Sequence, residues 1–523
     1  MRLGKSVIVT IACFVVLFIH SCGSSERQKK DRKVFASDLS IGKKLAATYC
    51  QSCHLLPDPS LLDSRTWING VLPVMGPRLG IFEHESKSYI YSRYDLELGK
   101  DFYPSKPALT NDQWQQLIDY YTYTSPDSLP SKQSRKYEIK NDTSLFTPQT
   151  ALFNYYSPSV SFVKIDTLRK DKPVLIADAG KNMLYRFNKD LSLFDSARTK
   201  SPVVDILFND GQWTTCNIGM LSPNNGKYGS VRTMKFYNNG KLKGDSTKLF
   251  DLLQRPVQIT AADINKDGRE DYVVCEFGFL TGSLSWMESK EEGKFVRHVI
   301  RLLPGAIKCY VRDENKDGLP DLWVLFAQGE EGIFLFTNLG NGQFSEKEVL
   351  RFPPVNGSSY FEFDDFNNDG FEDILYTCGD NADYSAILKP YHGVYIFLND
   401  GKNSFQQKYF FPINGCYKAI ARDFDNDGDL DIASIAHFAD YQRQPEEGFV
   451  YLENKGNFDF VPSSLQATRN GRWLTMDAGD FDDDGKIDLL LGNFSMAPAF
   501  IKSTVDWKNS PPFLLLKNKG RKE

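Results

Sequence analysis

The chain has 523 residues, 41% hydrophobic and 13% aromatic, so it is long and apolar enough for several folded cores and is not a disordered protein. Lys and Arg (62) nearly balance Asp and Glu (67), and the formal net charge is −5 at pH 7. Because no basic run and no basic-aromatic pattern is present, the composition argues against a nucleic-acid-binding protein.

The first 21 residues predict a secretory signal peptide. Arg2 and Lys5 precede an apolar run over residues 7–19, which is too short for a stable membrane span. Cys22 follows a small residue in a pattern that resembles a bacterial lipobox, and this resemblance implies that Cys22 is lipidated and anchors the mature chain to a bacterial membrane. An ordinary cleaved signal followed by an incidental Cys is the alternative.

After a polar tether predicted over residues 22–36, the chain carries a haem-attachment motif. A capped amphipathic helix is predicted over residues 40–50. It runs into Cys50-Gln-Ser-Cys53-His54, the C-x-x-C-H pattern in which two thiols form thioethers to haem and His54 binds the iron from one face. A zinc site would need a second C-x-x-C pair, and none is present. One covalent haem c is therefore the predicted cofactor.

The sixth iron ligand is predicted in the same segment. Met75 lies in a stretch bounded by Pro and Gly, before a final helix predicted over residues 110–121. His84 is the alternative donor, and an open iron site or a Met75 that only fills the core are the further alternatives. Residues 37–130 are similar to class I cytochromes c, which implies a small all-α cytochrome c domain with a methionine segment before its last helix.

A linker is predicted over residues 131–145 and a β domain over residues 146–523. In this domain a nine-residue phrase rich in Asp and Asn returns five times, at intervals of 50 to 58 residues. Oxygen ligands at positions 1, 3, 5 and 9, with Gly at position 6 for a sharp turn, suit Ca²⁺. The predicted ligands of about five Ca²⁺ ions are Asp263, Asn265, Asp267, Asp271, Asp313, Asn315, Asp317, Asp321, Asp365, Asn367, Asp369, Asp373, Asp423, Asp425, Asp427, Asp431, Asp480, Asp482, Asp484 and Asp488.

A predicted strand precedes each loop, a second follows it, and two more strands come before the next loop. Four strands per repeat predict the blade of a β-propeller. The repeats resemble the FG-GAP or VCBS family, the calcium-loop propellers best known from integrin α subunits, which implies that calcium stabilises the turn between two strands. Residues 162–187 and 204–237 predict two further blades with degenerate loops. The predicted fold is mainly β, a seven-bladed β-propeller with a small all-α cytochrome c domain at the N-terminus.

The blade ends opposite the calcium loops predict a functional rim. The longest loops of the β domain lie on this rim, which favours binding there. Its polar side chains either line a cavity for a polar ligand, with His437 as candidate general base, or bond to one another and to water. The candidate catalytic residues are His437, Glu276, Asp380 and Arg472, with Lys308 and Lys418 beside them.

Three functions fit this organisation. The preferred hypothesis is a membrane-anchored electron-transfer protein that faces the periplasm or the cell surface and whose propeller binds a redox partner protein, a small molecule or a glycan. The second is a periplasmic oxidoreductase of the dehydrogenase type that passes electrons from a rim pocket to the haem, although no quinone or flavin site is recognisable. The third is a surface adhesion or carbohydrate-binding scaffold. The haem motif argues against the third hypothesis.

Overall fold

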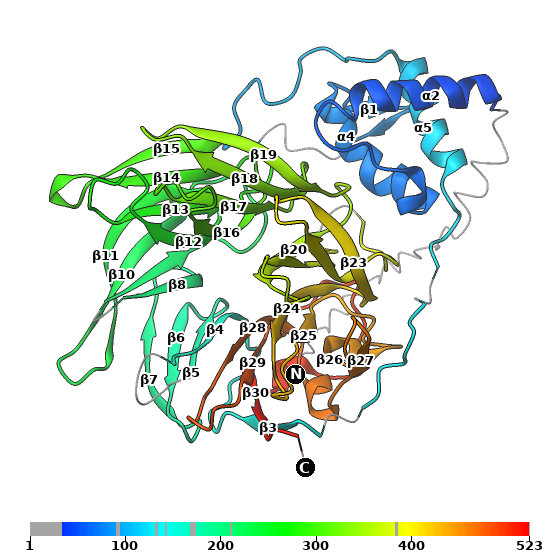
Figure 1. The fold of residues 1–523 in the computed structure, drawn as a ribbon. Helices are drawn as coiled ribbons and strands as arrows, with labels where there is room; N and C mark the ends of the chain where they lie inside the picture. Colours follow the sequence, from blue (N-terminus) through cyan, green and yellow to red (C-terminus); the bar gives the residue numbers. More distant parts are fainter. Residues whose placement is uncertain are drawn as a thin grey trace, which may run out of the picture.

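The computed structural model describes residues 34–89, 95–130, 134–141, 144–167, 174–209, 212–381 and 385–521. The predicted signal peptide, the lipidation site Cys22 and most of the tether lie outside these described residues. Figure 1 shows a ring of β-sheets with a small helical unit at one side. Within the described ranges, none of the helices combines the length and apolar character needed to cross a membrane.

The β domain is a seven-bladed β-propeller, as the repeat spacing predicts. In the described residues, seven four-stranded antiparallel sheets surround a common centre (Figure 1). Each predicted calcium loop joins the first and second strands of one blade, and these blades are numbered 3 to 7 in chain order. The corresponding sequences of blades 1 and 2 do not carry the repeated phrase. The second strands of blades 3 to 7 are completely buried, because neighbouring blades cover both of their faces.

The strands of blades 1 and 2 are β4 (Val160–Ile165), β5 (Val174–Asp178), β6 (Met183–Phe187), β7 (Leu193–Arg198), β8 (Val203–Asn209), β9 (Gln212–Asn217), β10 (Gly229–Phe236) and β11 (Leu242–Leu253). Those of blades 3 and 4 are β12 (Pro256–Ala262), β13 (Asp271–Glu276), β14 (Ser283–Ser289), β15 (Phe295–Arg301), β16 (Ala306–Arg312), β17 (Asp321–Phe326), β18 (Gly332–Asn338) and β19 (Phe344–Arg351). Those of blades 5 and 6 are β20 (Ser358–Asp364), β21 (Asp373–Cys378), β22 (Gly393–Asn399), β23 (Phe405–Pro412), β24 (Cys416–Arg422), β25 (Asp431–Ala436), β26 (Phe449–Asn454) and β27 (Phe460–Ser463). Blade 7 contains β28 (Trp473–Gly479), β29 (Asp488–Asn493), β30 (Phe513–Asn518) and β3 (Phe146–Thr150).

The inner strands of the propeller have one edge that faces the central channel and has no neighbouring strand. At each of the seven blade junctions among the described residues, a side chain of one inner strand hydrogen-bonds to the backbone of the next inner strand. The pairs are Ser161 Oγ to Val203 O (2.7 Å), Asp205 Oδ2 to Ile259 N (3.1 Å), Gln258 Nε2 to Cys309 O (3.1 Å), Tyr310 OH to Phe361 O (3.0 Å), Glu362 Oε1 to Ala421 N (2.6 Å), Lys418 Nζ to Met476 O (2.8 Å) and Asp477 Oδ2 to Ile165 N (2.8 Å). These bonds satisfy backbone groups that would otherwise be unpaired.

The helical unit contains α2 (Ala36–Tyr49), α3 (Ser64–Thr66), α4 (Leu72–Arg78) and α5 (Asn111–Thr124), with a short hairpin of β1 (Glu83–His84) and β2 (Lys87–Ser88). Thr110 caps α5 by accepting a hydrogen bond from Gln113 N, as a capping box requires. Both predicted helices are present, but α2 begins at Ala36, so Ser40 lies inside the helix and is not its cap. The segment that carries Met75 is the helix α4, which accommodates a proline in its first turn.

The helical unit lies against the rim of the propeller. Val355, in the connection between blades 4 and 5, and Ile387 of blade 5 pack on its apolar core. The Tyr391 hydroxyl donates to the Leu61 carbonyl at 3.2 Å. A second contact reaches blade 2, where Asn225 Nδ2 donates to Asp95 Oδ2 at 2.8 Å. The predicted linker is also engaged, since Arg135 forms an ion pair with Glu447 beside blade 6.

Blade 7 depends on the N-terminal strand β3, which pairs with β30 and so closes the ring. Phe146 of this strand is 2% exposed and contacts the rings of Phe424 and Tyr451 edge-on. We predict that Phe146→Ala lowers the free energy of unfolding by about 3 to 5 kcal/mol, because it leaves a cavity at the closing blade. In urea unfolding the control Gln149→Ala, at an exposed position, should stay near wild type. Equal small effects of both variants would show that β3 does not close the propeller.

Candidate functional site

The five predicted calcium loops share one backbone conformation. The Gly at position 6 has φ between 80° and 95° in all five loops, and the residue at position 4 has φ between 57° and 65°. Only Gly adopts the first of these values without strain, which explains why Gly recurs at this position. The repeated phrase therefore encodes a repeated turn.

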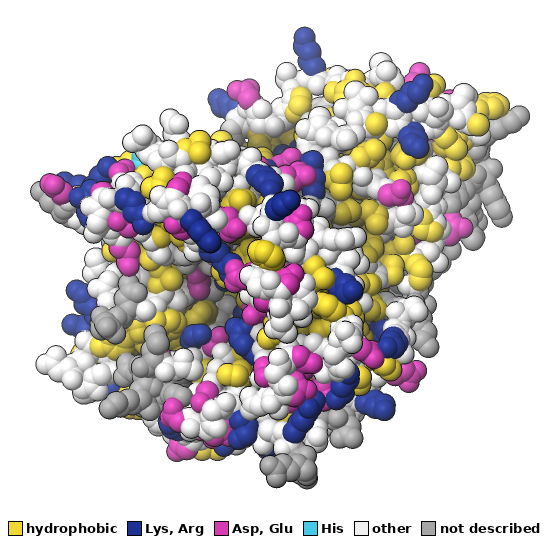
Figure 2. All heavy atoms as spheres, viewed as in Figure 1, with side chains coloured by type: hydrophobic (Ala, Val, Ile, Leu, Met, Phe, Trp, Pro, Cys, Tyr) yellow, Lys and Arg dark blue, Asp and Glu magenta, His cyan; other side chains and the backbone are white. Residues whose placement is uncertain are grey.

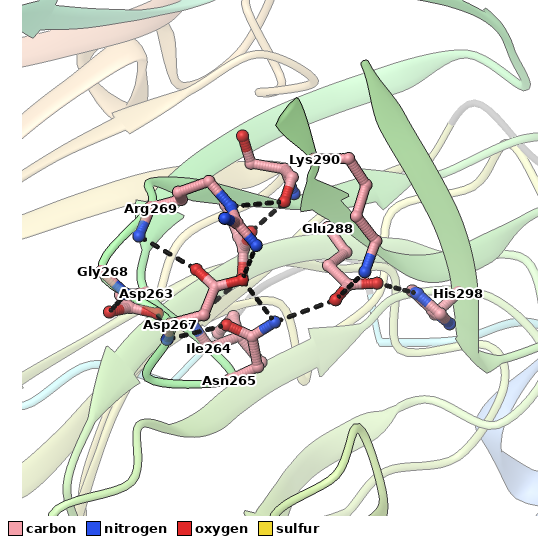
Figure 3. Close-up of polar contacts among 11 residues, drawn as sticks. Asp263, Ile264, Asn265, Asp267, Gly268, Arg269, Glu288, Lys290 and His298 are labelled. Carbon is pink, nitrogen blue, oxygen red and sulfur yellow. Dashed lines mark hydrogen bonds and ion pairs between the residues drawn. The ribbon is translucent and has the colours of Figure 1, made fainter. Parts of the chain in front are cut away.

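Hydrogen bonds within the first loop hold its oxygen atoms in place, as Figure 3 shows. Asp263 accepts hydrogen bonds from the backbone N–H groups of Asp267 (3.0 Å) and Gly268 (2.9 Å). Asn265 Nδ2 donates to Glu288 Oε1 at 2.9 Å, and Glu288 also pairs with His298 at 2.9 Å. The loop is thus preorganised by its own backbone.

The position-9 aspartates begin the second strands and are completely buried. Asp488 Oδ2 accepts from Phe481 N at 2.8 Å and Oδ1 accepts from Asn518 N at 2.7 Å. The corresponding residues of the other loops are Asp271, Asp321, Asp373 and Asp431. A carboxylate held in this way fixes the end of the loop relative to its strand.

Two of the loops bring carboxylate oxygens together closely enough to share one ion. The ligand atoms of Asp423, Asp425 and Asp427 lie within 4.8 Å of one another, and so do those of Asp480, Asp482 and Asp488. The buried Oδ1 atoms of Asp425 and Asp482 accept no hydrogen bond from the described residues. Burial and then Asp427 raise the pKa of Asp425 to about 6. The other oxygens of these carboxylates meet basic side chains, since Arg521 pairs with Asp425 at 2.6 Å and with Asp427 at 2.9 Å, and Lys517 pairs with Asp482. The buried acceptors that remain suit a divalent cation.

The residues of the C-x-x-C-H motif lie at the end of α2 and in the turn that follows. Cys50 is partly buried and Cys53 is exposed, and neither is in a disulfide. The His54 ring lies 2.9 Å from the Leu55 carbonyl through Nδ1, so a proton on Nδ1 leaves the lone pair on Nε2. Burial lowers the pKa of His54, and the nearby Arg351 lowers it further while Glu330 raises it. The motif therefore faces the rim of blade 4.

The two candidates for the sixth ligand differ in their surroundings. Met75 packs against the same apolar cluster as Cys50, which also contains the buried Trp67 and Leu62. His84 lies on the short hairpin, where its Nε2 is 2.6 Å from Gln115 Oε1 of α5. The Met75 side chain thus shares an apolar environment with the attachment motif, whereas one His84 nitrogen is already engaged.

The predicted rim residues fall into separate groups. Arg472 is completely buried and donates through Nε to the carbonyl of His437 at 2.9 Å, while its Nη2 and the His437 Nδ1 are buried without a hydrogen-bond partner among the described residues. Burial and the adjacent Arg472 hold the pKa of His437 well below its usual value, so this imidazole is neutral. Burial lowers the pKa of Arg472 to about 10, and the charge of Asp380 opposes this shift. Asp380 therefore belongs to the same region.

Glu276 belongs to another part of the rim. It is completely buried within blade 3, where it accepts from Ser283 Oγ and Ser285 Oγ, both at 3.0 Å, and pairs with Arg297 at 2.5 Å. Glu276 also accepts from Gln254 N at 2.7 Å, in the connection from blade 2, so its contacts come from blade 3 and from that connection. Whether any of the four rim candidates is catalytic stays a prediction.

Lys308 and Lys418 lie in the channel and not with His437. Their ammonium groups are 5.7 Å and 4.7 Å from the ring centre of Tyr360. Both residues occupy the third position of an inner strand, and the third residue is partly exposed in all seven blades. The sequence analysis did not predict the ring of junction bonds described above, although polar residues at the third or fifth position of six inner strands, and Ser161 at the second position of β4, were the available signal. Figure 2 shows basic and acidic side chains interspersed over one face of the molecule.

The FG-GAP-like repeat family model matches residues 313–376 and 423–491 of this chain. These segments contain the calcium loops of blades 4, 5, 6 and 7. The chain thus contains FG-GAP-like repeats in a seven-bladed propeller. No curated protein matches the sequence.

Solved structures resemble the chain only in broad outline. Sqt1 of Saccharomyces cerevisiae has 9% identity and a TM-score of 0.42, with 73% of this chain and 100% of that chain covered. BBS1N in complex with ARL6DN has 10% identity and a TM-score of 0.43, with 72% of this chain and 98% of that chain covered. Likenesses at this level carry no functional information.

The geometry of the loops predicts a strong effect of calcium removal. Without a cation, three carboxylates at one turn repel one another beside an inner strand, and in the loop of blade 6 Arg521 is the basic side chain that pairs with two of them. We expect a strong chelator to lower the melting temperature of the calcium-saturated protein, as measured by differential scanning calorimetry. Asp425→Ala should reduce the bound calcium by one ion per chain, whereas Asp400→Ala, in an exposed turn outside the loops, should not. An unchanged melting temperature after chelation would contradict the calcium assignment.

Lys418 predicts a specific dependence of stability on pH. Burial lowers its pKa to about 8, below the value near 10.4 of an unfolded lysine. Between these values the unfolded chain binds more protons than the folded one, so this residue makes stability rise with pH. The free energy of unfolding of wild type relative to Lys418→Met should therefore increase from pH 7.5 to pH 10 in urea titrations. Parallel profiles for the two proteins would disprove this shift.

Proposed function

We propose that this protein is an exported c-type cytochrome in which a calcium-stabilised propeller binds a partner or ligand and a haem unit on its rim transfers electrons. The observation that carries the proposal is the Cys50-Gln-Ser-Cys53-His54 motif, which follows α2 in a helical unit packed on the propeller. The FG-GAP-like propeller supports the broader part of the proposal, a scaffold that binds a ligand or partner. The lipid anchor at Cys22 belongs to the same proposal.

The residues of the helical unit fit a covalent haem. Two thiols separated by two residues lie beside a histidine whose Nδ1 contacts a backbone carbonyl, which orients the ring and leaves Nε2 for iron. Cys50 and Met75 border one apolar cluster, which offers the low-polarity surroundings that a haem face requires. Met75 is the preferred sixth ligand and His84 the alternative.

Bound at this motif, haem would supply a one-electron redox couple. The chain's own residues would hold it by thioethers from Cys50 and Cys53, orient the His54 ring through the Leu55 carbonyl, and exclude water with the core around Trp67. The contacts of Tyr391 and Asn225 would keep the helical unit in one position on the rim. Electron transfer between a partner bound at the rim and the haem would require such a fixed position.

The five calcium loops would keep the propeller rigid at the end opposite this contact. Each loop joins the first two strands of a blade, so an ion there would fix the inner strand relative to the second. The calcium is proposed as structural, with no part in electron transfer. The rim loops would then supply the binding surface.

An oxidoreductase with its own rim pocket is the second candidate. The observation that favours it is the pair of buried nitrogens on Arg472 and His437 that lack partners among the described residues. A neutral His437 beside a guanidinium could accept a proton from a substrate. Burial of both side chains limits access, so this candidate ranks below electron transfer.

Haem attachment can be tested on the full-length protein produced in a host that attaches haem c. We predict that the wild type carries one haem that survives acid extraction, seen in its intact mass and absorption spectrum. Cys53→Ala should lose most of this stable haem, because one thioether is missing. Ser52→Ala changes the exposed residue between the thiols and should remain loaded. A wild type without covalent haem, or a fully loaded Cys53→Ala, would refute the proposal.

A further inference from the structure

Lys308 differs from the neighbouring polar residues of the channel. Asp205, Gln258 and Lys418, at the same position of other inner strands, each bond to the backbone of the next blade. In the described part of the chain, Lys308 has no hydrogen bond and no ion pair, and its nitrogen lies 4.8 Å from the ring centre of Tyr310 and 5.7 Å from that of Tyr360. An ammonium group held only by aromatic rings in a channel keeps its three donors available.

A second ammonium lies across the same aromatic ring. Lys418 Nζ is 4.7 Å from the ring centre of Tyr360 and donates one hydrogen bond to the Met476 carbonyl at 2.8 Å. Tyr360 itself is only partly exposed, so the two cations flank one ring inside the channel. Two positive charges in a region of limited solvent favour a bound anion.

The carboxylates of the channel accept backbone N–H groups of the next blade and also act electrostatically on the two lysines. Glu362 accepts from Ala421 N at 2.6 Å and lies 3.5 Å from Arg422. Asp477 accepts from Ile165 N at 2.8 Å and pairs with Lys164 at 3.2 Å. Asp205 of the second blade accepts from Ile259 N at 3.1 Å, and its charge raises the pKa of Lys308. None of these carboxylates forms an ion pair with Lys308 among the described residues.

We propose that the channel at Lys308 binds a small oxyanion, either a carboxylate or a tetrahedral anion such as sulfate. Lys308 donates to the anion beside the Tyr360 ring, and Lys418 adds a second positive charge near the same ring. The inference rests on the proposed role of the propeller as a ligand-binding scaffold and is independent of the haem. It names the chemical class of ligand that this scaffold takes.

The test is isothermal titration of calcium-saturated full-length protein with sodium sulfate or with sodium succinate, each against sodium chloride at equal ionic strength. We expect the wild type to bind sulfate or succinate saturably. The anion that binds with the lower Kd shows whether the site prefers a tetrahedral anion or a carboxylate. Lys308→Met should weaken that binding about tenfold, as expected for loss of one charged hydrogen bond. Lys308→Arg should retain it, because the charge and donors remain.

The matched control is Lys164→Met, which removes a channel lysine that Asp477 already pairs with. It should bind the anion as wild type does. The melting temperature of each variant verifies folding, and Lys308→Gln replaces Lys308→Met if the latter is unstable. No saturable binding of either anion by the wild type overturns the proposal, and so does equal binding by the folded Lys308 variants. Haem content is recorded on the same samples, so failure of anion binding is distinguished from failure of haem attachment.

Discussion

The unpaired channel edge of the inner strands is the constraint on which the rest of the propeller depends. A blade pairs its strands internally, but its innermost strand has no neighbour on the channel side. Residues such as Asp205, Glu362 and Asp477 accept the backbone N–H groups of the next blade, and others donate to its carbonyls. An unmade bond there would cost the desolvation of a peptide group, so each junction needs a polar side chain of suitable length.

This arrangement separates the two ends of the propeller. At one end the inner strands enter the calcium loops, whose position-9 aspartates anchor the second strands. At the other end the loops are long and receive the helical unit through Tyr391 and Asn225. A rigid end and an end with exposed loops are suited to different tasks, namely support and binding. Lys308 lies between them as a channel cation without an ion pair in the described residues.

Much of the fold was predictable because it repeats. Five copies of one loop indicate five blades, and the strands on either side of each loop follow from their apolar patterns. The closing strand Phe146–Thr150 and the junction bonds could not be predicted in the same way, because each depends on a partner far away in the sequence. The strand pattern predicts that Glu276 lies on the rim, yet in the structure it is buried and bonds to Arg297 and to two serines of its blade. Convergence of side chains is a tertiary property that periodicity does not encode.

Hydrogen exchange of individual amides tests the account of the channel most directly. The N–H groups of Ile165, Ile259 and Ala421 face the channel edge and are bonded only by side chains of the preceding blade. The account predicts that they exchange as slowly as amides inside the sheets, and that Asp477→Ala accelerates exchange at Ile165 while Ile259 and Ala421 remain protected. Fast exchange at all three positions in the wild type would contradict it.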